Sequence, residues 1–285
     1  WRQMAIIDTE FVMTDILVTP DGEDLYLTTS NPWGPESVWQ SYTEPLGKRW
    51  VRVLTVDSDS GAVMLAISPE YDEDRTLYVA EHNGDQLAVS RDAGDSWEWQ
   101  RTSPEPLLDL VVVDTRTLFA VIPGGRIMKT TYSGKVWDDP VDTLLDEVNM
   151  LARAADGTLF AGSDDGYVSY STDDGASFTL IEEPVGDGAV QVMPDVAYAD
   201  NGWLYVGTSG ADEGLWRWRI GVSDYWQQLD NDITQLGDGQ RIGGLLMGEE
   251  GTLYPLRTEP ADDDAGGMTR WLCPACEPCV DFEYD

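Results

Sequence analysis

The chain has 285 residues, of which 42% are hydrophobic and 10% aromatic, so it can bury a sizeable core and is not a disordered polymer. Its 53 acidic residues against 17 Lys and Arg give a formal net charge of −36. Such a surface repels nucleic acid and anionic lipid, so basic proteins or cations are the expected partners. No run of about 18 apolar residues is present, which argues against a membrane span.

A short strand-like phrase recurs along the whole chain. Its copies are DLYLT (24–28), TLYVA (76–80), TLFAV (117–121), TLFAG (158–162), WLYVG (203–207) and TLYPL (252–256). Six copies at a spacing of roughly 40–50 residues indicate a repeat architecture.

Each copy has the same neighbours in sequence. The apolar runs that precede the copies are 16–20, 63–68, 110–114, 150–154, 195–199 and 243–247. Turn residues such as Asn83-Gly84 and Gly124-Gly125 follow. A third alternating run then leads through a second turn to an outer strand that is often rich in tryptophan, such as WEWQ (97–100).

Four short antiparallel strands per period are typical of a propeller blade. We therefore predict an all-β protein: one β-propeller of about six four-stranded blades over residues 1–285. The predicted blades span 11–56, 62–102, 107–140, 148–184, 192–230 and 241–285. Segment 142–150 is the best candidate for a helix, and residues 1–8 are expected to close the ring as an outer strand. Because the chain opens at Trp1, it is expected to be processed or part of a longer precursor.

The turn between the third and fourth strands repeats a polar pattern. SRDAGDSW (90–97) and STDDGASF (171–178) both fit Ser-x-Asp-x-Gly-x-Ser-aromatic. Weaker versions are TTYSGKVW (130–137) and TEPLGKRW (43–50).

A structural role explains these residues better than catalysis or metal binding, because a site used once would not be copied from blade to blade. We expect the aspartate to accept hydrogen bonds within its turn, the glycine to supply an unusual backbone angle, and the aromatic ring to cover the turn. The predicted structural residues are Ser90, Asp92, Gly94, Ser96, Trp97, Ser171, Asp173, Gly175, Ser177 and Phe178.

These two segments resemble the Asp-box, or BNR repeat, of sialidase, sortilin and photosystem II assembly-factor propellers. The resemblance implies the fold but no particular activity. Sialidases of this kind use three arginines, a tyrosine nucleophile with a glutamate, and an early Arg-Ile-Pro motif. Here Arg126-Ile127-Met128 and Arg241-Ile242-Gly243 are the nearest matches, and Arg153 and Arg241 are two candidates for the arginines. The assembly factors present a basic patch, for which this sequence shows no cluster of Lys and Arg.

Three cysteines, Cys273, Cys276 and Cys279, fall in CPACEPC and are the only ones in the chain. We favour a local disulfide with one remaining thiol over a metal site, for which a fourth ligand would have to come from elsewhere. The single histidine, His82, is expected to be a solvated loop residue. Loop acids such as Asp138-Asp139 and Asp262-Asp263-Asp264 leave calcium open, and no other cofactor is expected.

From these features we expect a non-catalytic binding or scaffold module at the cell surface or outside the cell. Its acidic faces and blade loops would dock a protein or a glycan, and a larger assembly is left open. The alternative is a glycoside hydrolase, sialidase-like or another Asp-box glycosidase.

Overall fold

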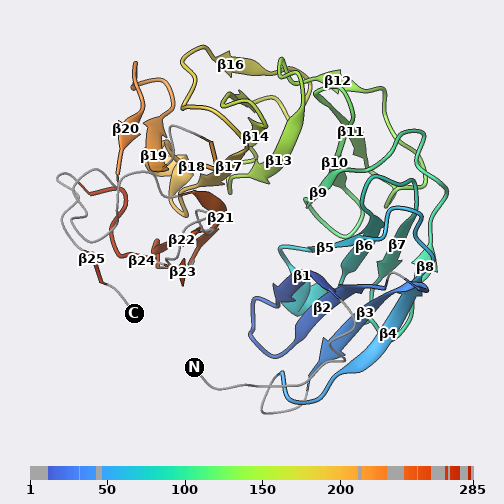
Figure 1. The fold of residues 1–285 in the computed structure, drawn as a ribbon. Helices are drawn as coiled ribbons and strands as arrows, with labels where there is room; N and C mark the ends of the chain where they lie inside the picture. Colours follow the sequence, from blue (N-terminus) through green and yellow to red (C-terminus); the bar gives the residue numbers. More distant parts are fainter. Residues whose placement is uncertain are drawn as a thin grey trace. The chain divides into compact units, whose positions relative to one another are not determined.

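The computed structural model is almost entirely β, as predicted, and consists of six antiparallel sheets that follow one another along the chain (Figure 1). It describes residues 12–31, 33–42, 47–210, 214–229, 241–248, 250–257, 267–268, 270–276 and 282–283. Sheets of four consecutive antiparallel strands, repeated six times, are the blades of a six-bladed β-propeller.

The first three blades contain strands β1 to β12. Blade 1 consists of β1 (Val12–Val18), β2 (Leu25–Ser30), β3 (Glu36–Ser41) and β4 (Val51–Val56). Blade 2 consists of β5 (Val63–Ile67), β6 (Leu77–Glu81), β7 (Leu87–Ser90) and β8 (Glu98–Trp99). Blade 3 consists of β9 (Asp109–Val112), β10 (Leu118–Ile122), β11 (Arg126–Thr130) and β12 (Val141–Asp142).

The last three blades contain strands β13 to β25. Blade 4 consists of β13 (Val148–Arg153), β14 (Leu159–Ser163), β15 (Val168–Ser171) and β16 (Thr179–Ile181). Blade 5 consists of β17 (Val190–Pro194), β18 (Trp203–Thr208), β19 (Gly214–Arg219) and β20 (Gln227–Gln228). Blade 6 consists of β21 (Ile242–Met247), β22 (Leu253–Arg257), β24 (Arg270–Trp271) and β25 (Phe282–Glu283), and β23 (Gly267–Met268) also pairs with β22.

The recurring phrase of the sequence forms the second strand of every blade. In β6, β10 and β14 all five residues are buried. A strand can be apolar on both faces only when other layers cover both, and in a propeller the adjacent blades supply those layers. The continuous apolar character of the phrase therefore reflects its position inside the stack of blades.

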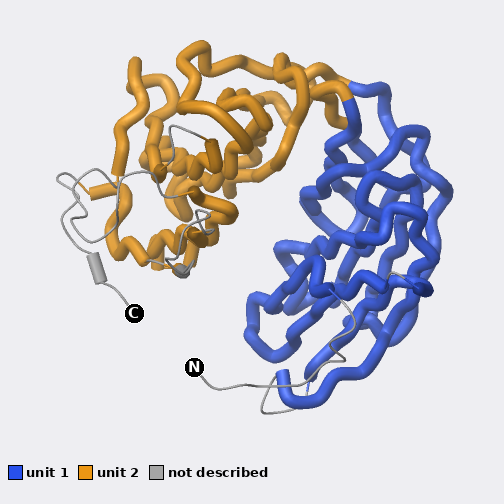
Figure 2. Tube along the Cα trace, viewed as in Figure 1, with its two compact units in different colours: residues 1–123, 128–140 blue, residues 124–127, 141–285 orange. Residues whose placement is uncertain are grey.

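The chain divides into two compact units, residues 1–123 with 128–140 and residues 124–127 with 141–285, which are described separately (Figure 2). In the first unit, blades 1 and 2 share a cluster that contains Val38 and Val79, and blades 2 and 3 share one that contains Leu87 and Leu118. In the second unit, the corresponding clusters join blade 4 to blade 5 and blade 5 to blade 6. Within each unit, the core therefore lies between neighbouring sheets.

Two single-turn helices, α1 (Tyr71–Asp74) and α2 (Tyr198–Asn201), follow the first strands of blades 2 and 5. The strand predicted from the apolar run 195–199 is wrong. Asp195 and its neighbours form a turn because the Asp195 carboxylate accepts the Ala197 N–H and the Asn201 amide, both at 2.8 Å. Segment 142–150, the best candidate for a helix, is not helical, since Asp142 ends β12 and Val148 begins β13.

Residues 1–8, the predicted closing strand, lie outside the described residues, so that expectation stays a prediction. In blade 6 the fourth place in the order of strands is taken by β25. No helix among the described residues is both long and apolar enough to cross a membrane.

Candidate functional site

The turn at Ser90–Trp97 is closed by its own polar side chains. Asp92 Oδ1 accepts the Ser90 hydroxyl at 2.8 Å and the Ser96 N–H at 2.9 Å, and Asp92 Oδ2 accepts the Ser96 hydroxyl at 2.5 Å. The Ser90 hydroxyl oxygen in turn accepts the Gly94 N–H at 2.8 Å. Gly94 has φ 86°, in the left-handed region that glycine adopts without strain. The Trp97 indole N–H donates to the Gly94 carbonyl at 3.1 Å, so the ring covers the turn.

The turn at Ser171–Phe178 of blade 4 has the same set of hydrogen bonds. Asp173 accepts the Ser171 hydroxyl at 2.8 Å, the Ser177 N–H at 2.9 Å and the Ser177 hydroxyl at 2.6 Å. The Gly175 N–H donates to the Ser171 hydroxyl at 3.0 Å, and Gly175 has φ 79°. Two turns far apart in sequence thus use the same residue types in the same way.

The turn of blade 3 retains only part of this arrangement. Gly134 has φ 84°, and its N–H donates to the Thr130 hydroxyl at 3.2 Å. Tyr132 stands where Asp92 stands in blade 2, and the buried Trp137 indole nitrogen has no hydrogen-bond partner. In blade 1, the Gly47 N–H donates to Ser41 at 2.9 Å. The hydroxyl-to-glycine hydrogen bond is therefore retained in turns that lack the aspartate.

Hydrogen bonding keeps both turn aspartates ionised. The Ser177 hydroxyl, with the Ser177 N–H, lowers the pKa of Asp173 to about 2. The Ser96 hydroxyl likewise lowers the pKa of Asp92 below its usual value. An ionised carboxylate whose oxygens are already occupied by turn donors is poorly suited to act as a general acid.

The turns of blades 2 and 3 also contact the preceding blade. The Tyr26 hydroxyl of blade 1 donates to the Ala93 carbonyl at 2.7 Å, inside the turn of blade 2. The Tyr78 hydroxyl of blade 2 donates to the Thr115 carbonyl of blade 3 at 2.9 Å, and that carbonyl also accepts the Ser133 hydroxyl. A Cβ on Gly134 would lie 2.3 Å from a methyl carbon of Leu87, so this glycine is needed for close approach.

Sequence analysis missed these tyrosines as a group. Tyr26 and Tyr78 occupy the same position of the recurring phrase, and Tyr205 occupies it in blade 5, where its hydroxyl donates to Asp195 at 2.6 Å. The third position of the phrase is aromatic in every copy, as tyrosine in some and phenylalanine in others. This pattern could have identified the tyrosines from the sequence.

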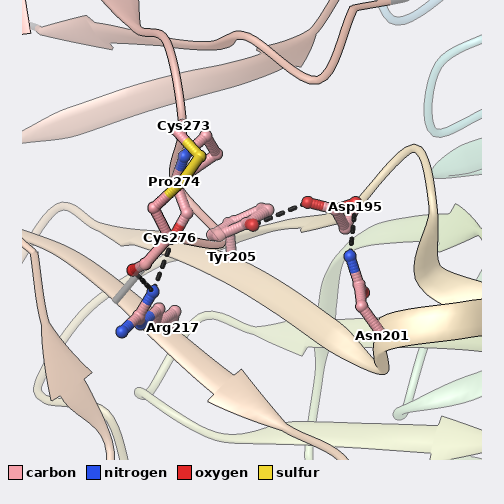
Figure 3. The surroundings of a disulfide bond; sticks show 7 residues. All are labelled: Asp195, Asn201, Tyr205, Arg217, Cys273, Pro274 and Cys276. Carbon is pink, nitrogen blue, oxygen red and sulfur yellow. Dashed lines mark hydrogen bonds between the residues drawn. A yellow bond between two sulfur atoms is a disulfide. The ribbon is translucent and has the colours of Figure 1, made fainter. Parts of the chain in front are cut away.

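The CPACEPC segment contains a disulfide between Cys273 and Cys276, whose Cα atoms are 5.3 Å apart (Figure 3). Arg217 of β19 holds this loop: one guanidinium nitrogen donates to the Pro274 carbonyl at 2.7 Å and to the Cys276 carbonyl at 3.1 Å. Arg217 is buried and lies over the Trp203 ring, 4.3 Å from its centroid. The loop is thereby attached to the middle of blade 5. Cys279 lies outside the described residues.

The other candidates from the sequence lie on different blades. Arg153 is the last residue of β13, and Arg241 immediately precedes β21. Arg126 begins β11. His82 is exposed, and its Nδ1 lies 3.1 Å from the Leu108 carbonyl oxygen.

One carboxylate has the opposite environment from the turn aspartates. Burial raises the pKa of Asp15, on the innermost strand of blade 1, although the N–H groups of Leu65 and Ile16 donate to it at 2.9 and 2.8 Å. Sequence analysis did not identify Asp15, since it lies in an ordinary alternating strand.

Among the described residues, no group of three or more His, Cys, Asp or Glu side chains could hold a metal ion. Asp138 and Asp139 are exposed, and Asp262 to Asp264 lie outside the described residues. Calcium binding therefore stays a prediction.

No family model and no curated protein matches the sequence. Solved structures do match the fold. YCF48 from Cyanidioschyzon merolae superposes with a TM-score of 0.65 at 14% identity, over 95% of this chain and 84% of that chain. The extracellular domain of the putative one component system BT4673 from B. thetaiotaomicron superposes with a TM-score of 0.63 at 14% identity, over 94% of this chain. The match spans 33% of the BT4673 chain. At this identity the comparisons establish the fold alone.

Proposed function

We propose that this propeller is a non-catalytic binding or scaffold module of a secreted or cell-surface protein, which docks a protein or a glycan through its faces and loops. The observation that carries the proposal is a set of aromatic side chains left on the surface. Their exposed fractions are Trp33 91%, Tyr42 56%, Trp99 45%, Tyr132 54% and Tyr225 60%. Aromatic rings are enriched where proteins bind partners, because they offer a large apolar area at low entropic cost.

The location of the module is supported by the Cys273–Cys276 disulfide, since such bonds persist mainly in oxidising compartments. The similarity to an extracellular domain is consistent with the same location. A single propeller attached to further domains would present these surfaces to partners outside the cell.

We propose that the module is non-catalytic because the aspartates of its repeated turns have a structural role. Asp92 and Asp173 are ionised and occupied within their turns. In the alternative, most glycoside hydrolases need a pair of carboxylates with different proton affinities, whereas a sialidase-like enzyme would use a tyrosine nucleophile with a glutamate. Burial raises the pKa of Asp15, so Asp15 is a residue on which the alternative can be tested.

A combined assay separates the two functions. The purified chain is incubated with a panel of chromogenic glycosides that includes sialosides, and in parallel its binding to a glycan array and to purified surface proteins is measured. We expect no turnover and saturable binding that weakens in Trp33→Ala or Tyr132→Ala. Turnover that disappears in Asp15→Asn, or binding indifferent to all of the exposed aromatic residues, would overturn the proposal.

A further inference from the structure

A shallow hollow of about 330 Å³ lies at the outer side of the first unit, where β8 of blade 2 meets the turn of blade 3. It is lined by Trp99, Gln100, Arg101, Lys135 and Val136. This volume is at the lower end of the range for small-molecule sites.

The hollow forms where the repeat departs from its own pattern. Lys135 and Val136 occupy the turn positions that Asp95 and Ser96 occupy in blade 2, and Trp99 occupies the outer-strand position of Leu180 in blade 4. Residues copied from blade to blade serve the fold. Lys135 has a counterpart in Lys48 of blade 1, whereas Trp99 and Arg101 have none at the corresponding positions of blades 1, 3 and 4. The hollow that these side chains line together is therefore a candidate for function.

Two lining residues provide an apolar wall. Trp99 is 45% exposed and Val136 is 58% exposed, whereas most hydrophobic side chains among the described residues are buried or half-buried. An indole face open to solvent offers a flat surface on which a rigid ring with apolar C–H groups can stack.

The same hollow carries positive charge in a strongly acidic chain. Lys135 Nζ lies 2.9 Å from Glu98 Oε1, and an Arg91 guanidinium nitrogen lies 3.4 Å from Glu98 Oε2. Of these cations only Lys135 lines the hollow, and the exposed Arg101 is the second cation of its lining. Arg101 and Lys135 are far apart in the sequence, so the sequence alone shows no basic cluster.

Gln100 supplies an acceptor that the protein does not use. Its amide nitrogen donates to the Glu98 carbonyl at 2.9 Å, while its buried Oε1 has no hydrogen-bond partner. A buried acceptor without a donor is costly. Because this oxygen is buried, it is not open to the hollow, so Gln100 contributes to the wall and not a direct contact for a ligand.

We propose that this hollow binds a uronic acid unit of an acidic carbohydrate: the sugar ring stacks on Trp99, and its carboxylate pairs with Arg101 and Lys135. This inference rests on the proposed binding function and names its ligand class. The net charge of −36 disfavours polyanions at long range, but salt screens charges beyond about 8 Å, so the local cations decide the contact.

The test compares ligands that lack either the negative charge or the sugar ring. Tetragalacturonate and its methyl ester are titrated into the whole chain at pH 7 and about 0.15 M salt by calorimetry, with a tetraglutamate peptide as a second acid. We expect saturable binding of tetragalacturonate, and binding of the ester and of the peptide at least about tenfold weaker. Equal affinity for the peptide would make the hollow an acidic-peptide site and overturn the proposal.

Matched variants locate the binding. Trp99→Ala and Arg101→Gln should each weaken tetragalacturonate binding about tenfold. Val222→Ala shortens an exposed apolar side chain of blade 5, and Arg49→Gln removes an exposed arginine from the turn of blade 1, so both should leave the affinity unchanged. Circular dichroism is used to check that each variant is folded. Equal effects of Trp99→Ala and Val222→Ala, or no binding by the wild type, would overturn the inference.

The two proposals fail in different ways. If tetragalacturonate does not bind but another glycan or a protein binds through the exposed aromatic residues, the uronate site is wrong and the binding function stands. If tetragalacturonate binds at Trp99 but a glycoside is hydrolysed elsewhere in an Asp15-dependent way, the hollow stands and the non-catalytic function is wrong.

Discussion

Replacing Tyr26 by phenylalanine tests whether hydroxyl groups fasten one blade to the next. Tyr26 is fully buried, and its hydroxyl has three partners: the Ala93 carbonyl at 2.7 Å, the Tyr71 hydroxyl at 2.9 Å and the Gln40 amide at 3.0 Å. Tyr78 is also fully buried at the same repeat position, and its hydroxyl donates to the Thr115 carbonyl at 2.9 Å. Phenylalanine retains the ring, so the change in stability of each variant relative to the wild type reports on the loss of one hydroxyl group.

Each buried hydrogen bond contributes about 1 kcal/mol net. Tyr26→Phe should therefore lower the free energy of unfolding by about 3 kcal/mol, and Tyr78→Phe by about 1 kcal/mol. Urea denaturation followed by tryptophan fluorescence measures both. Because burial raises the pKa of the Tyr26 phenol, it stays protonated and the difference should keep about the same size from about pH 5 to about pH 9. Equal losses in the two variants would refute the idea that the Tyr26 network fastens blades 1 and 2.

Three further predictions concern the turns and the disulfide. Because the folded pKa of Asp173 is about 2, its stabilisation is present above about pH 4 and lost as the pH falls through about 2, so the gap in thermal midpoint between wild type and Asp173→Asn should narrow from about pH 4 to about pH 2. Gly134→Ala should cost about 2–3 kcal/mol in urea denaturation, since φ is 84° and the new Cβ would meet a leucine at 2.3 Å. Reducing the Cys273–Cys276 disulfide should cost about 2 kcal/mol, the loop-closure value for so short a loop, measured as a denaturation midpoint with and without reductant.

Controls exist for each of these. Gly22 has φ 68°, and a Cβ added there would have no atom within 4 Å, so Gly22→Ala should cost about 1 kcal/mol, and an equal cost at Gly134 would contradict the argument from close approach. A constant gap for Asp173→Asn down to about pH 2 would show that its carboxylate does not act through its charge. The reductant is tested in a Cys279→Ser background, and an unchanged midpoint there would show that the loop is held by Arg217 alone.

The fold could be predicted because the repeated strand phrase is recognisable in the sequence. In β6, β10 and β14 the phrase is buried along its whole length, so it is apolar on both faces, and this leaves a recognisable signature such as LFAVI in β10. The prediction failed where a polar side chain hydrogen-bonds the nearby backbone within a segment whose hydrophobic pattern suggests a strand. Residues 195–199 are apolar enough for a strand, but Asp195 binds the backbone and side chain of the residues that follow and forms a turn.

The polar network and the hollow could not be predicted, because they depend on contacts between blades. Tyr26, Tyr71 and Gln40 come from three elements, and nothing in their local sequence indicates that they meet. Arg101 and Lys135 line the same hollow only because β8 lies beside the turn of blade 3. The spacing of residues along the chain predicts contacts within a blade, but it predicts few of the contacts between neighbouring blades.

The bond between a hydroxyl and the turn glycine has a consequence for how such proteins diversify. Since Thr130 and Gly134 close the turn of blade 3 without the aspartate, the positions around them are free to vary without opening the hairpin. A protein engineer could therefore use these corners as grafting sites, exchanging Lys135 and Val136 for other side chains while the β-sheet framework stays intact.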